Sequence, residues 1–178
     1  MKKRVDLANF DIKFVGLKVG KHDFQFKIDS DFISKFQDAL IDKLDIILNF
    51  TLDKQSERLF LLDFVFTGTI ELECDRCLQE FDYPVKQHNR LVLKVENVEE
   101  NSDDDVIFVS SNDFKVNIAR YVYEFVCLIV PMKKTCEFIN KECDKEMLKL
   151  INNYSIQSAK TENKTDSEWN ILKNLKNN

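Results

Sequence analysis

The sequence has little glycine and little proline, with three Gly and two Pro among 178 residues. So few glycines leave little room for phosphate-cradling loops, and neither a Walker A loop nor a Rossmann fingerprint occurs. No catalytic constellation accompanies the two histidines, His22 and His88. We therefore predict that the protein is not an enzyme and has no small-molecule substrate. Its turns must be made mostly by Asp, Asn, Ser and Lys.

Long hydrophobic runs are absent as well. The longest apolar block, Phe125 to Met132, is far shorter than the roughly 20 residues that a membrane-spanning helix needs. The basic start, Met1-Lys2-Lys3-Arg4, is followed by a broken, charged stretch and lacks the apolar core of a signal peptide. We expect a cytoplasmic protein without a membrane partner. Thiols stay reduced there, so the five cysteines are expected as thiols or metal ligands.

Arginine is also scarce, because Lys and Arg total 26 but only five of them are Arg. The formal net charge is −5, which disfavours a general phosphate-binding surface, since non-specific nucleic-acid affinity comes from cations that neutralise phosphates. A local basic patch remains compatible with this charge. The net charge favours a basic protein partner at least as much as naked RNA.

The composition that remains is that of a folded domain, with 44% apolar and 32% charged residues and fifteen Phe. Residues that alternate between apolar and polar predict strands. We predict an α+β fold with a largely antiparallel β-sheet, one or two packed helices and a mobile C-terminal tail. The predicted strands lie near residues 10–14, 24–28, 46–52, 62–72, 81–95 and 106–109. Gly68 is predicted to mark a bulge in the fourth of them.

Two segments have helical spacing. The first is predicted to begin at Ser30, as the N-cap, and to continue to about Leu44. The second spans Val116 to Val130 and ends at Pro131, with Asp113 or Asn117 as the cap at its start. This second helix is expected to pack on a face of the sheet, with Cys127 as a small core residue.

The end of the chain is polar. We predict a domain over residues 1–151 and a polar tail over residues 152–178. The tail contains the one tryptophan, Trp169, at helical spacing with Leu172 and Leu175, which predicts a docking segment. A further polar segment, Glu99 to Asp105, is predicted to be an acidic surface loop.

The sharpest local signal is Cys74-Asp75-Arg76-Cys77, placed between two predicted strands. Two cysteines separated by two residues form half of a tetrahedral metal site, and Cys136 with Cys143 can supply the other half. Their spacing of six residues is wider than usual. Zinc bound by four thiolates is one interpretation, and four separate thiols are another. A redox pair at Cys74 and Cys77 is disfavoured. Redox CxxC motifs usually lie at a helix N-terminus, which lowers the pKa of a thiol, whereas here one predicted strand leads into the motif and another follows it.

Basic side chains recur at even positions of the fifth predicted strand, which places them on one face of it. The ordinary interpretation is a solvated sheet face. The functional interpretation is a strip that contacts RNA phosphates or another partner, joined by an arginine of the cysteine motif. The residues of this predicted contact surface are Lys86, His88, Arg90, Lys94 and Arg76, with Trp169 as a further partner contact.

These features together resemble the YceD family of bacterial large ribosomal RNA subunit accumulation proteins. The resemblance covers nearly the whole chain. Its most specific piece is Cys74-Asp75-Arg76-Cys77-Leu78, with Phe81 beyond it. Weaker pieces occur in the expected order: the helix ending Leu128-Ile129-Val130-Pro131, then Cys136, then Cys143 to Leu148 and Asp166 to Leu175.

The resemblance implies a role in ribosome assembly and no enzymatic activity. Several members of the family have a denser cysteine cluster, which implies a metal site, whereas this chain has only Cys136 and Cys143 in that region. The expected function is support of large-subunit ribosomal RNA accumulation, by binding precursor RNA or a basic ribosomal protein. The alternatives are a zinc-stapled adaptor domain without a ribosomal role, or a thiol redox protein that uses Cys74 and Cys77.

Overall fold

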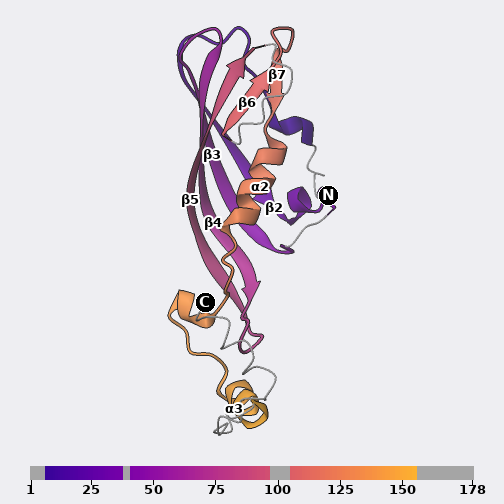
Figure 1. Cartoon of the computed structure of the whole chain (residues 1–178), viewed down its shortest axis with the longest axis vertical. Helices are drawn as coiled ribbons and strands as arrows, with labels where there is room; N and C mark the ends of the chain where they lie inside the picture. Colours follow the sequence, from indigo (N-terminus) through magenta and orange to yellow (C-terminus); the bar gives the residue numbers. More distant parts are fainter. Residues whose placement is uncertain (1–6, 38–40, 97–104, 156–178) are drawn as a thin grey trace, which may run out of the picture. The chain divides into compact units, whose positions relative to one another are not determined.

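Five strands form the main sheet of this protein, in the order β2-β3-β4-β5-β6 (Figure 1). The computed structural model describes residues 7–37, 41–96 and 105–155. The chain divides into two units, residues 1–143 and 144–178, and each is described by itself. The strands of the main sheet are β2 (Gly20–Asp29), β3 (Leu44–Lys54), β4 (Leu59–Glu73), β5 (Glu80–Val95) and β6 (Val106–Val109).

The predicted α+β class is confirmed. β2, β3, β4 and β5 pair in antiparallel register, and the short β6 adds one parallel pair beside Val92 to Val95. Two three-residue strands, β1 (Asp11–Lys13) and β7 (Lys115–Asn117), form a separate antiparallel pair. The remaining elements of the first unit are η1 (Leu7–Phe10), α1 (Ser30–Ile33), α2 (Ala119–Ile129) and η2 (Cys136–Ile139).

The alternation in the sequence decides which face of the sheet is buried. On β4, Phe60, Leu62, Phe64 and Phe66 are buried, and the same face continues beyond Gly68 through two more apolar residues. The other strands contribute buried residues at matching positions, and the aromatic rings contact one another, as those of Phe50 and Phe64 do at 4.9 Å. The core therefore lies on one face of the sheet.

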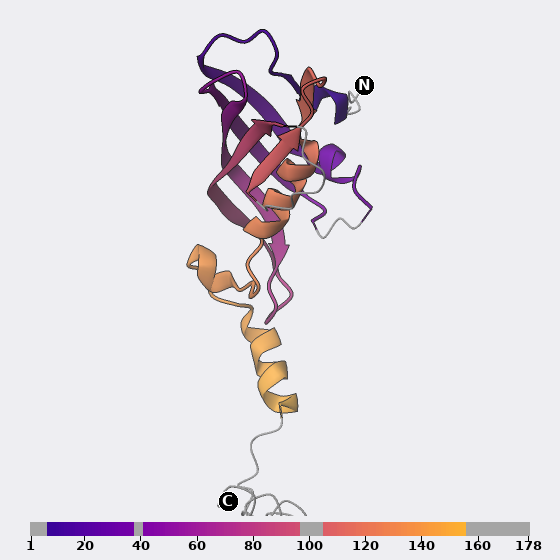
Figure 2. The same cartoon turned by 45° about the horizontal axis from the view of Figure 1, so that its top comes forward.

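The helix α2 covers this core face, as predicted (Figures 1 and 2). The ring of Phe125 packs edge-on against Phe64 and Phe66 of β4. The predicted start at Val116 is wrong, because residues 115–117 pair with β1 and the helix begins at Ala119. Asn117, one of the two predicted caps, accepts a hydrogen bond from the Ala119 backbone N–H at 3.0 Å.

The helix predicted from Ser30 to about Leu44 is much shorter than expected. It ends at Ile33, and its N-cap is Asp29, whose carboxylate accepts a hydrogen bond from the Phe32 backbone N–H. Phe32 and Ile33 are already fully buried in this single turn. Farther along the described chain, Ile41 and Leu44 are also buried, just before β3 and at its first residue.

The predicted bulge at Gly68 is also wrong. The register is continuous on both sides, since Gly68 lies opposite Ile46 on β3 and opposite Val85 on β5. The glycine is required by a close approach of two strands. Its φ is +154°, and a Cβ atom there would lie 2.1 Å from the carbonyl oxygen of Asp45.

The second unit contributes one described helix, α3 (Lys145–Tyr154). Asp144 caps it by accepting hydrogen bonds from the Glu146 and Met147 backbone N–H groups. The helix continues past residue 151, so the predicted domain boundary falls within it and stays a prediction. Trp169 and the rest of residues 156–178 lie outside the described residues, as does the acidic loop apart from Asp105. No helix in the described ranges is long and apolar enough to cross a membrane.

Candidate metal centre

The first half of the candidate centre is the tight turn that joins β4 to β5. Buried residues of β4 lead directly into Cys74, and the chain then reverses within a few residues. The Leu78 N–H donates to the Cys74 carbonyl at 2.9 Å, and the Cys74 N–H donates to the Gln79 carbonyl at 3.0 Å. Leu78 has a φ of +59°, which the sharp reversal requires. The turn directs both Cys74 and Cys77 into the interior.

The second half is the C-terminal arm, defined here as residues 131–143, which follows α2. Its 3-10 helix η2 (Cys136–Ile139) is followed by Asn140 as the C-cap, which has a φ of +53°. The N–H groups of Asn140 and Lys141 donate to the carbonyls of Glu137 and Cys136, each at 3.1 Å. These bonds fold the chain back, so Cys143 returns to Cys136 in spite of the wide spacing.

The four cysteines of the two halves form one cluster. The Sγ atoms of Cys74 and Cys143 are 3.8 Å apart, and those of Cys77 and Cys136 are 3.6 Å apart. All four Sγ atoms lie within 4.8 Å of one another, and all four residues are buried. We refer to this group as the cysteine cluster. The pairs are too far apart to be disulfides, whose S–S bond is about 2.05 Å.

These distances fit a single metal ion. Zinc binds thiolate at about 2.3 Å, and a regular tetrahedron of that radius has edges of about 3.8 Å. A tetrahedral set of four thiolates is typical of zinc or iron. An iron–sulfur cluster has several inorganic atoms between its thiolates and requires wider separations than these. Since four protein ligands complete the coordination, such a site is structural, with no open position for a substrate.

Hydrogen bonds and ion pairs also join the two halves outside the cluster. The Asp75 N–H donates to the Lys134 carbonyl at 2.7 Å, and the Lys134 N–H donates to the Asp75 carboxylate at 2.6 Å. The Arg76 guanidinium donates to the Glu137 carboxylate at 2.8 Å. The two residues between Cys74 and Cys77 therefore both bind the C-terminal arm. Figure 1 shows the arm passing beside this turn.

The electrostatics of the cluster favour one thiolate in the absence of metal. Burial disfavours the charged form of Cys74, but N–H groups of Arg76, Cys77 and Cys136 donate to its sulfur and lower the pKa of this thiol to about 6. Burial, with hydrogen bonds to Cys77 and Cys74, raises the pKa of Cys136 to about 12. Burial also raises the pKa of Cys143. A divalent cation supplies the charge needed to ionise the remaining thiols.

The predicted basic contact residues lie on one face of β5, away from the core. Lys86, His88, Arg90 and Lys94 are all exposed at alternating positions. The strip is partly neutralised, because the Asp63 carboxylate accepts hydrogen bonds from Arg90 at 2.8 Å and from His88 at 3.1 Å. Arg76 is separate from it and pairs with Glu137. Contact with RNA or protein stays a prediction for these residues and for Trp169.

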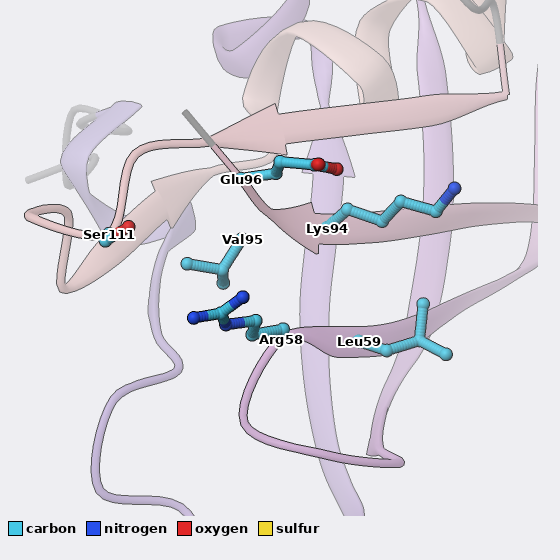
Figure 3. Close-up of a pocket in the computed structure, with 6 residues that line it drawn as sticks. All are labelled: Arg58, Leu59, Lys94, Val95, Glu96 and Ser111. Carbon is cyan, nitrogen blue, oxygen red and sulfur yellow. The ribbon is translucent and has the colours of Figure 1, made fainter. Parts of the chain in front are cut away.

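A pocket of about 420 Å³ lies at the other end of β5 from the turn, and Arg58, Lys94 and Glu96 are among the residues that line it. Figure 3 shows the Arg58 and Lys94 side chains pointing in opposite directions, so their charges do not converge on one ligand. A small-molecule site requires convergent polar groups. We assign no ligand to this pocket.

A family model of the large ribosomal RNA subunit accumulation protein YceD matches residues 62–176, which is most of the chain. The chain belongs to the YceD family. The match begins within β4 and includes all four residues of the cysteine cluster. The name of the family indicates a role in accumulation of large-subunit ribosomal RNA. No curated protein and no solved structure matches this chain.

The sequence motif of this YceD family member identified the thiols but missed the residues that hold the two halves together. Asp75, Lys134 and Glu137 are ordinary surface types, and their pairing depends on the turn and the arm lying side by side. One signal was present in the sequence. A charged pair placed between two metal-ligand cysteines lies on the outside of the turn, where it can bind only a neighbouring segment or solvent.

Proposed function

We propose that this protein supports the accumulation of large-subunit ribosomal RNA as a binding protein, without catalysis, on an assembly intermediate in the cytoplasm. The observation that carries the proposal is the family match over residues 62–176. The partner is precursor large-subunit RNA or a basic ribosomal protein. The net charge of −5 favours the basic protein, and the strip on β5 favours RNA.

In this proposal the cysteine cluster holds one zinc ion as a structural staple. The S–S distances of 3.6 and 3.8 Å support it, because they match the edge of a zinc–thiolate tetrahedron. Bound zinc would offset part of the negative charge of the thiolates and fasten the C-terminal arm to the β4–β5 turn. The chain itself supplies the N–H groups that donate to the Cys74 sulfur. It also supplies the hydrogen bond from Lys134 to Asp75 and the ion pair between Arg76 and Glu137.

The test is a pull-down of the full-length tagged chain from native cells, at low and at moderate salt, with RNA and protein both identified. Recovery of precursor large-subunit RNA with early large-subunit proteins is the expected result. Recovery of one basic ribosomal protein without RNA would identify a chaperone for that protein. Recovery of neither would contradict the ribosomal role.

A zinc-stapled adaptor without a ribosomal role is the second candidate, and the cysteine cluster by itself is equally compatible with it. Zinc analysis of the purified chain combined with a negative pull-down would favour this candidate. A thiol redox function is a weaker third. Turnover on a disulfide substrate that requires Cys74 and Cys77 would favour it over both binding functions.

A further inference from the structure

The end of the sheet beside the cysteine cluster contains two like-charged cross-strand pairs. Glu71 lies opposite Asp82, and Glu73 lies opposite Glu80, in the last two outward-facing positions of β4 and the first two of β5. Directly opposed like charges destabilise a sheet, because their Cβ atoms are only about 4.5–5.5 Å apart. The fold does not explain why four carboxylates gather here.

A cation at this end is surrounded by carboxylates. Lys43 pairs with Glu71, and the charges of Glu71 and then Glu80 and Asp42 raise the pKa of its ammonium. A pocket of about 240 Å³ opens at the same place, and it is lined by Ile41, Asp42, Lys43, Glu71, Leu72, Glu73, Glu80 and Lys134. Four carboxylates against two ammonium groups leave the pocket negative, and Leu72 gives it an apolar wall. Its size and charge suit the side chain of a lysine or an arginine.

Apolar side chains are exposed at the same end of the sheet, around the β4–β5 turn and on the core face. Leu78 follows Cys77 and is 58% exposed, and Phe138 lies two residues after Cys136 and is 48% exposed. The 3.6 Å separation of the Cys77 and Cys136 sulfurs places their two turns together. Phe138 also packs edge-on against Tyr83 of β5, with ring centroids 5.8 Å apart.

Leu78 is unexpected for a second reason. Its φ of +59° lies in the left-handed region, which glycine and asparagine adopt with less strain than leucine. Leu78 is therefore an exposed apolar residue in a backbone conformation that is unfavourable for leucine. Positions where a sequence breaks local rules without a gain in packing are expected at functional sites.

We propose that this end of the sheet is a docking surface for a basic, Lys- and Arg-rich protein segment that carries an apolar anchor. The apolar anchor packs on Leu78 and Phe138, and the basic side chains bind Glu73, Glu80 and the negative pocket. The inference rests on the proposed function, and it selects a basic ribosomal protein over RNA as the partner at this surface. Phosphate would be repelled by these carboxylates.

Two variants of the full-length, zinc-loaded chain test the surface. Leu78→Asn keeps a residue that tolerates the left-handed turn, and Glu73→Gln with Glu80→Gln removes the repulsion between strands. Both variants are expected to keep one zinc per chain and a melting temperature at or above that of the wild type. Loss of the zinc, or a melting temperature below that of the wild type, would show that these side chains stabilise the fold, and that result would overturn the inference.

The matched controls lie elsewhere on the sheet. Asp23→Asn with Asp53→Asn removes two negative charges near the β2–β3 end that holds Gly20 and Lys54. Lys86→Gln with Arg90→Gln removes two positive charges from the strip on β5. The probes are purified large-subunit ribosomal proteins with basic extensions, tested one at a time, and transcribed large-subunit ribosomal RNA.

The expected result is that at least one basic ribosomal protein binds the wild type and both control variants equally. Leu78→Asn and the Glu73/Glu80 variant should bind it about tenfold more weakly, or worse. Binding of RNA alone, lost in the Lys86/Arg90 variant, would overturn this inference and leave the proposed function intact. Binding of neither probe would overturn both.

Discussion

Cys77 and Cys136 are separated by 59 residues in the sequence, and their Sγ atoms lie 3.6 Å apart in the structure. This relationship joins the β4–β5 turn to the segment that follows α2. It also places Asp75 and Arg76 next to the C-terminal arm. The predictions below test whether a metal makes this junction and how the sheet beside it is stabilised.

The first prediction concerns the metal ligands. Cys77→Ser and Cys136→Ser are expected to abolish stoichiometric zinc binding, because each removes one of four thiolates. Cys127→Ser is the control, since Cys127 lies in α2 outside the cluster and its loss should leave one zinc per chain. Native mass spectrometry of the purified variants measures this. Zinc retained in Cys136→Ser would contradict the assignment.

Zinc removal should loosen the C-terminal arm and spare the sheet, because most buried side chains of β2 to β5, such as Phe50 and Phe64, lie along the paired strands and away from the turn that holds Cys74 and Cys77. Zinc at 1,000 times its dissociation constant should raise the apparent stability by about 4 kcal/mol. In limited proteolysis, chelator should expose residues 131–143 to cleavage while the strand signal in circular dichroism persists. Complete unfolding on chelation would show that the sheet itself depends on the metal.

Zinc affinity should rise with pH. Cys136, with its pKa near 12, and Cys143, with a raised pKa, are both protonated in the metal-free chain at pH 7, whereas Cys74, with its pKa near 6, is largely ionised. Zinc must therefore release at least the two protons of Cys136 and Cys143, and acid should favour release of the metal. Calorimetry in buffers of different ionisation enthalpy counts these protons. Binding without proton release would be inconsistent with this.

The close approach at Gly68 gives a sharp stability prediction. Gly68→Ala would place a Cβ atom 2.1 Å from the Asp45 carbonyl oxygen, and should lower the free energy of unfolding by about 3 kcal/mol. Gly16→Ala is the matched control, since Gly16 also has a positive φ but nothing lies within 4 Å of the added atom. It should cost only about 1 kcal/mol. Equal losses in urea unfolding would refute the steric explanation.

The ion pair of Asp63 gives a pH-dependent prediction. Burial opposes ionisation, but hydrogen bonds from Arg90 and His88 outweigh it and lower the pKa of Asp63 below 3.8. A lowered carboxyl pKa stabilises the fold above the unfolded pKa, and this contribution disappears as the pH falls through the folded pKa. Arg90→Gln should therefore cost about 0.5–1 kcal/mol at pH 7 and less at an acid pH below the folded pKa of Asp63.

The measurement is urea unfolding at the two pH values. Lys86→Gln on the same strand face is the control, and a change of less than about 0.5 kcal/mol is expected at either pH. A deficit in Arg90→Gln that persists undiminished in acid would mean that Arg90 acts through packing of its side chain.

Long strands could be predicted from the sequence because their alternation is sustained. The predicted strands at residues 62–72 and 81–95 match β4 and β5 closely, and the predicted strand at residues 10–14 contains the short β1. β7, with three residues, carries too little alternation to be recognised, so Val116 and Asn117 fall within the predicted helix. The segment after Ser30 has helical spacing, yet its first turn already buries Phe32 and Ile33, and tertiary packing overrides the pattern beyond it.

The four cysteines of the candidate site can be predicted from the sequence, but the turns and contacts that bring them together cannot. The two-residue spacing of Cys74 and Cys77 is typical of metal ligands and can be recognised in the sequence. Cys136 and Cys143 are brought together by a 3-10 turn and by Asn140 in the left-handed conformation. No spacing rule anticipates that turn. The opposed carboxylates Glu73 and Glu80 depend on the strand register, which appears only when β4 and β5 are paired.

X-ray absorption at the zinc edge of the purified full-length chain would determine whether the four cysteines bind one structural zinc. We expect one zinc per chain with four sulfur neighbours at about 2.3 Å and no nitrogen or oxygen neighbour. A chain that purifies without metal and takes up none, or a zinc with nitrogen or oxygen ligands, would contradict it.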